Sequence, residues 1–95
     1  MNTFWQDAVS IFETACKAGA DGGAGELNIV IGEGGGLQIV AGEGWRPDAL
    51  AEHYGALTVY QIKRQRGAVR VEGRRMGMSC LLQSAQPAAA CHMLP

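Results

Sequence analysis

The sequence predicts a single α+β domain: a five-stranded antiparallel sheet with two helices packed on one of its faces. Three patterns support this prediction. The chain begins with a stretch of helical apolar periodicity, continues with five short segments that alternate in polarity, and has a second, shorter helical segment after the second of them. With 95 residues, 47% of them apolar, the chain can form one core but not two domains.

Residues 3–18 predict an amphipathic helix, because their apolar side chains share one arc at 100° per residue. Thr3 and Gln6 have the spacing of a capping box at its start, and Gly19 can end it in a left-handed conformation. The apolar arc consists of Phe4, Trp5, Ala8, Val9, Ile11, Phe12, Ala15 and Cys16.

Residues 27–31 and 37–41 predict a β-hairpin, with the glycine-rich segment 32–36 as its turn. Pairing Ile31 with Leu37 brings six residues to one half-buried face, namely Leu27, Ile29, Ile31, Leu37, Ile39 and Ala41. The other face then carries Asn28, Val30, Gln38 and Val40. We therefore expect Val30 and Val40 to point away from the core and to belong to an interface with another protein.

A short helix is expected over residues 47–54, with Pro47 in its first turn and Gly55 just beyond its end. Three strands follow, at about 57–64, 68–73 and 77–83. The register that we expect pairs Ile62 with Val69, Tyr60 with Val71, Val71 with Met78 and Val69 with Cys80, so that the apolar side chains share one face. The domain then spans residues 1–84, and the Ala-rich tail 85–95 forms one short helix or has no fixed structure.

The resulting order is α-β-β-α-β-β-β. In topology it resembles profilin-like and roadblock-like domains, although no sequence motif is shared with either.

The cysteine count and the chain start favour a cytoplasmic protein. Three cysteines are an odd number, which argues against a secreted disulfide framework and for a reducing compartment. The first ten residues lack the basic and apolar regions of a signal peptide, and no apolar run approaches the length of a membrane span.

The formal net charge of −1 conceals two oppositely charged halves. Residues 1–55 carry eight acidic and two basic side chains, whereas residues 56–95 carry one acidic and six basic side chains. The halves therefore have net charges of −6 and +5. Either this asymmetry serves a charged partner, or the halves pack side by side and compensate each other.

No recognisable catalytic or metal motif is present, so neither an enzyme nor a cofactor is expected. The glycines at 32–36 lie between strands, whereas a phosphate-binding loop precedes a helix and ends in Gly-Lys-Ser/Thr. Cys16 and Cys80 lie at apolar positions, and Cys91-His92 lacks a second pair of metal ligands. His53 is expected to be exposed, and no serine has a recognisable base partner.

The strongest functional signal is a basic segment at 63–75. It contains Lys63, Arg64, Arg66, Arg70, Arg74 and Arg75, a predicted stripe for a charged partner or an anion. The expected register places these side chains at two turns joined by Arg70, and no aromatic residues interleave with them for base stacking. We therefore expect a protein–protein interaction module that forms a homodimer, with nucleic-acid or polyanion binding as the alternative.

Overall fold

The fold is a two-helix, five-stranded α+β domain, seen in a computed structural model that describes residues 3–18, 25–42, 44–65 and 67–84. The elements are α1 (Phe4–Ala18), β1 (Gly25–Gly32), β2 (Leu37–Ala41), α2 (Pro47–Tyr54), β3 (Ala56–Gln65), β4 (Ala68–Arg75) and β5 (Met78–Ser84). This order, and the antiparallel sheet, confirm the predicted fold class. The predicted tail 85–95 lies outside the described residues.

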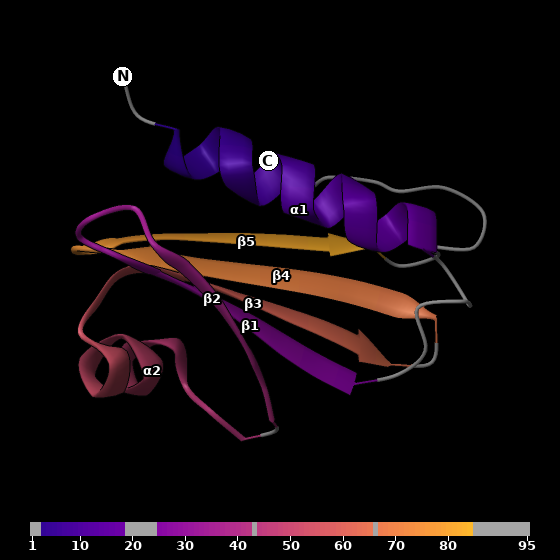
Figure 1. Cartoon of the computed structure of the whole chain (residues 1–95). Helices are drawn as coiled ribbons and strands as arrows, with labels where there is room; N and C mark the ends of the chain where they lie inside the picture. The colour runs from indigo at the N-terminus through magenta and orange to yellow at the C-terminus, as the bar shows by residue number, and fades with distance from the viewer. Residues whose placement is uncertain (1–2, 19–24, 43, 66, 85–95) are drawn as a thin grey trace.

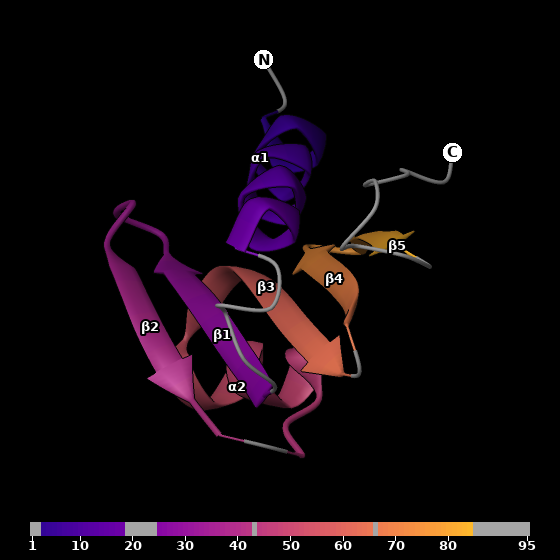
Figure 2. The ribbon, with the colours of Figure 1, turned by 90° about the vertical axis from the view of Figure 1, so that its right-hand side faces the viewer.

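The two helices cover opposite faces of the sheet (Figures 1 and 2), so the expectation that both pack on one face is wrong. The strand order is β2-β1-β3-β4-β5. Strands β2 and β3 both run antiparallel to β1, and are therefore parallel to each other, so the chain between them crosses over β1. Helix α2 forms that crossover. Because α2 covers the second face, the central strand β3 is buried on both sides from Thr58 to Ile62.

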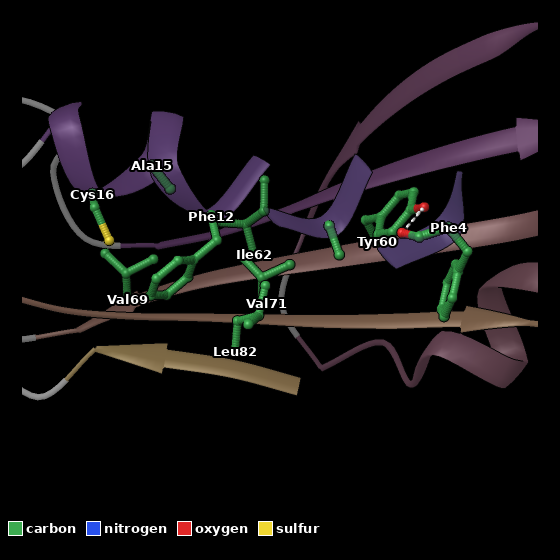
Figure 3. Close-up of a cluster of buried hydrophobic side chains, with 10 residues drawn as sticks. Phe4, Phe12, Ala15, Cys16, Tyr60, Ile62, Val69, Val71 and Leu82 are labelled. Atoms are coloured by element: carbon green, nitrogen blue, oxygen red, sulfur yellow. Dashed lines mark hydrogen bonds between the residues drawn. The ribbon is translucent and has the colours of Figure 1, made fainter. Parts of the chain in front are cut away.

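The larger core lies between α1 and the β3–β4–β5 part of the sheet (Figure 3). Phe12 of α1 packs among buried residues of three strands, including Ile62, Val71 and Leu82. At the start of α1, the Phe4 ring stacks on Tyr60 with 5.6 Å between ring centroids. The Tyr60 hydroxyl donates a 2.9 Å hydrogen bond to the Phe4 carbonyl oxygen, which fixes the helix start to β3.

The register of the β1–β2 hairpin is as predicted, with Ile29 opposite Ile39. The predicted register of the last three strands is wrong, because Ile62 lies opposite Val71 and Val71 opposite Leu82. Each turn forms later in the chain than expected, where a glycine adopts a positive φ: 79° at Gly67 and 86° at Gly77. Both slips are by an even number of residues, so the side chains keep their predicted faces.

Candidate interaction surfaces

An apolar surface lies on the β1–β2 hairpin, on the face of the sheet that α1 covers elsewhere. We call it the hairpin face; it consists of Leu27, Ile29, Ile31, Leu37 and Ile39. Leu37, Ile39 and Leu27 are 61%, 59% and 37% exposed, although the sequence predicts that they lie in the core. Helix α1 packs chiefly on β4, with β5 and β3 beside it. A helix about 10–12 Å wide covers only two to three strands spaced about 4.8 Å apart, so α1 does not reach β2 and leaves Ile29 and Ile31 of β1 half-buried at the margin of the core.

A groove separates α1 from β1 at the edge of the hairpin face. Its cavity volume is about 320 Å³, and its floor includes Leu27, Ile29 and Ile62. Helix α1 contributes the wall, on which the Thr14 hydroxyl donates a 2.9 Å hydrogen bond to the carbonyl oxygen of Ser10. The complete lining is Ser10, Ile11, Thr14, Ala15, Leu27, Ile29, Ile62 and Arg64. The groove is thus mainly apolar, with one charged residue in its lining.

Val30 and Val40 do not form the outer surface predicted for them. They lie on the predicted face, opposite the hairpin face, but α2 covers that face. Val30 is 3% exposed and packs with Leu50 and Val59 in a second, smaller core, against which Val40 is partly buried. The expectation is wrong because α2 packs on this face of the sheet and not on the face that α1 covers.

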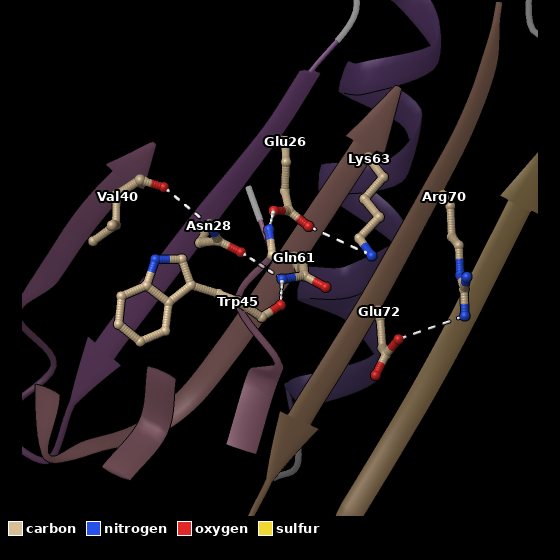
Figure 4. A network of polar contacts seen from close by, with 9 residues as sticks. Glu26, Asn28, Val40, Trp45, Gln61, Lys63, Arg70 and Glu72 are labelled. Atoms are coloured by element: carbon tan, nitrogen blue, oxygen red, sulfur yellow. Dashed lines mark hydrogen bonds and ion pairs between the residues drawn. The ribbon is translucent and has the colours of Figure 1, made fainter. Parts of the chain in front are cut away.

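Three residues of the predicted basic stripe share the α2 face, and each has a carboxylate partner. The Lys63 ammonium lies 3.5 Å from Glu26, and Arg70 lies 3.6 Å from Glu72 (Figure 4). Arg74 makes a two-pronged contact with Asp48 in the first turn of α2, at 2.9 and 3.0 Å. The Glu26 and Asp48 pairs join the acidic and basic halves of the chain, as the compensation interpretation predicts.

The other basic residues do not extend this stripe. Arg75 lies in β4 opposite Thr58, and Arg64 lines the groove beside α1, so both belong to the opposite face. The expectation that Arg74 and Arg75 occupy a turn is also wrong, because the turn follows them at Met76-Gly77. Arg66 lies outside the described residues.

A shallow polar hollow surrounds the two basic residues that face each other across β3 and β4. Lys63 and Arg70 are direct cross-strand partners, and each side chain is 49% exposed. The hollow has a volume of about 670 Å³ and also contains Gln65 and Gln83. Like charges directly opposite in a sheet repel each other, so the flanking carboxylates stabilise this arrangement.

A buried polar network anchors the connection between β2 and α2 (Figure 4). The Gln61 side-chain amide donates to Asn28 Oδ1 at 2.9 Å and to the Trp45 carbonyl oxygen at 2.7 Å. Asn28 donates in turn to the Val40 carbonyl oxygen at 3.3 Å, and the Glu26 carboxylate accepts from the Gly44 amide at 3.0 Å. The sequence signal for this network is an amide residue within each of two apolar strands, Asn28 in β1 and Gln61 in β3. Sequence analysis assigns no role to these two residues.

The reactive side chains are mostly part of the core. Cys16 is buried and Cys80 half-buried, both as free thiols, and burial raises the pKa of Cys80. Burial, together with the negative charge of Asp7, raises the pKa of Tyr60 to about 12. Over the described ranges, no three His, Cys, Asp or Glu side chains are grouped to hold a metal ion. In the same ranges, no helix has the length and apolarity needed to cross a membrane.

No protein-family model, curated protein or solved structure matches this chain. Among the described residues, three of the exposed large apolar side chains, Leu27, Leu37 and Ile39, lie together on the hairpin face.

Proposed function

We propose that this chain is a non-enzymatic protein–protein interaction module that associates with itself through the hairpin face. The observation that carries the proposal is the exposure of Leu37 and Ile39, at 61% and 59%, on a strand at the edge of the sheet. Charged residues and prolines usually keep an exposed edge strand from pairing with another chain, and strand β2 contains neither. An apolar, unprotected edge is typical of a surface that another chain covers.

A second copy suits this surface better than a charged partner. The five residues of the hairpin face are uncharged, so two copies can meet there without electrostatic repulsion. The ion pairs of Glu26 and Asp48 lie on the opposite face, where charge is already compensated within the chain. An uncharged surface offers nothing to select an acidic or a basic partner.

The exposed area sets the expected strength of this association. Burying a complete Leu or Ile side chain contributes about 1.5–3 kcal/mol, so the exposed parts of Leu27, Leu37 and Ile39 in two copies amount to about 5–9 kcal/mol. Association itself costs about 4–15 kcal/mol. These three side chains alone therefore support only a weak dimer, and a tighter one needs additional contacts.

Sedimentation velocity over a range of concentrations tests the proposal, with Ile39→Asp as the variant. We expect the wild-type sedimentation coefficient to rise with concentration and that of Ile39→Asp to stay at the monomer value. Gln38→Asp is the matched control, because Gln38 is also exposed on β2 but points to the opposite face. A wild-type chain that remains monomeric at high micromolar concentration would refute self-association.

The free thiols of Cys16 and Cys80 support the cytoplasmic location that we include in the proposal.

Polyanion or nucleic-acid binding is the second candidate, and the hollow around Lys63 and Arg70 favours it. It is the weaker candidate because Glu26 and Glu72 already lie within 4 Å of these two side chains. A binding titration with single-stranded and duplex DNA at low salt tests it. Binding that weakens steeply with added salt, and that Lys63→Ala reduces, would support this function. Absence of binding at low salt would exclude it.

A further inference from the structure

The hairpin face and the flank of α1 together form a step on the surface of the molecule. Helix α1 stands one layer above the sheet over β3, β4 and β5 (Figure 2), and among the described residues no helix packs beside it on the same face of β1 and β2, where Leu37 and Ile39 are exposed. A second sheet that packs face to face on the first lies about 10 Å above it, close to the diameter of a helix. The step beside α1 therefore has the height that the hairpin of another copy needs.

We propose that in the dimer the hairpin of each copy fills this step of the other, with Leu37 and Ile39 inserted into the groove between α1 and β1. This inference rests on the proposed self-association, and it assigns the mode of contact. The arrangement is isologous: each copy supplies both the inserted side chains and the groove, so the contact is made twice about a two-fold axis.

The groove has the size and chemistry that aliphatic side chains require. Its volume of about 320 Å³ lies at the lower end of the range of ligand pockets and suits a few side chains. The Thr14 hydroxyl is already bonded to the Ser10 carbonyl oxygen, so the helical wall can make apolar contacts without leaving that donor unsatisfied. Ser10 and Thr14 are both exposed, so their burial adds the contact area that the hairpin face alone lacks.

Two single variants test the inserted side chains and the groove independently. Ile39→Asp removes the inserted apolar group, whereas Thr14→Arg places a cation in the groove wall. We expect each variant to weaken dimerisation at least about tenfold. Gln6→Arg is the matched control for Thr14→Arg, because it adds the same charge at another exposed position of α1. Circular dichroism tests whether each variant is folded. If Thr14→Arg does not fold, Ser10→Arg takes its place as the groove variant.

Mixing the two variants gives the decisive result. A mixed dimer has one intact contact, and its second contact brings the carboxylate introduced by Ile39→Asp in one copy beside the guanidinium introduced by Thr14→Arg in the other. We therefore expect the mixture to dimerise where each variant alone is monomeric. A wild-type dimer that Thr14→Arg does not weaken, or a mixture that stays monomeric, would overturn this mode of contact and leave self-association standing. A monomeric wild-type chain would instead overturn the proposed function itself.

Discussion

Replacing Gly73 with alanine would place a methyl group inside the main core, where the structure leaves no room for it. A Cβ atom at this position would lie 2.8 Å from Cys80 Sγ, 3.0 Å from Tyr60 Cδ1 and 3.1 Å from Phe4 Cε1. The φ of Gly73 is not positive, so the cost arises from crowding and not from the backbone. Overpacking of a well-packed core costs about 1–3 kcal/mol, and contact on three sides favours the upper part of that range.

Urea denaturation of Gly73→Ala measures this cost as a lower free energy of unfolding. Gly36→Ala is the matched control, because a Cβ there meets no atom within 4 Å and its φ is not positive. We expect the control to leave stability unchanged or to raise it by up to about 1 kcal/mol. Cys80→Ala removes the nearest atom, so the cost of Gly73→Ala should be smaller in that background. A Gly73→Ala protein within about 0.5 kcal/mol of wild type would refute the packing described around Phe4 and Tyr60.

Three further predictions follow from single contacts. Gln61→Leu leaves the Asn28 and Trp45 oxygens without their donor, and urea denaturation should show a loss of about 1–3 kcal/mol; an unchanged midpoint would contradict the network. The raised pKa of Tyr60 means that the unfolded chain loses the phenol proton at a lower pH than the folded chain does, so the free energy of unfolding should fall from about pH 10 to 12. Tyr60→Phe should reduce that fall. An equal fall in the wild type and the variant would contradict the assignment. Asp48→Ala removes the exposed partner of Arg74 and should cost less than about 1 kcal/mol at low salt; a larger loss would show that the pair anchors α2.

The sequence predicts each element because the local signals agree. Apolar periodicity located α1, Pro47 and Gly55 bounded α2, and alternation with glycine-rich turns located the strands. The hairpin register followed from the requirement that Leu27, Ile29 and Ile31 share a face. The predicted registers of β3, β4 and β5 are wrong because turns at several positions would keep the same side chains on the same faces. The turns form where Gly67, Met76 and Gly77 adopt a positive φ, which the alternation of polar and apolar residues does not indicate.

The candidate surface could not be predicted because it depends on which face each helix covers. Periodicity shows that Ile39 and Val30 lie on opposite faces, but not which of them a helix buries. The structure buries Val30 under α2 and leaves Ile39 exposed, the reverse of the expectation. The width of α1 then limits its coverage to the β3–β4–β5 part of that face. This is a property of packing that no local sequence pattern encodes.

Amide chemical shifts followed by NMR during dilution test most directly whether the hairpin face is the contact surface. We predict that dilution from millimolar to low micromolar concentration shifts the resonances of β1, of β2 and of Ser10–Thr14 on the flank of α1, while those of α2 stay constant. Dilution shifts confined to α2 or to the opposite edge strand β5, or no shifts at all, would contradict the account.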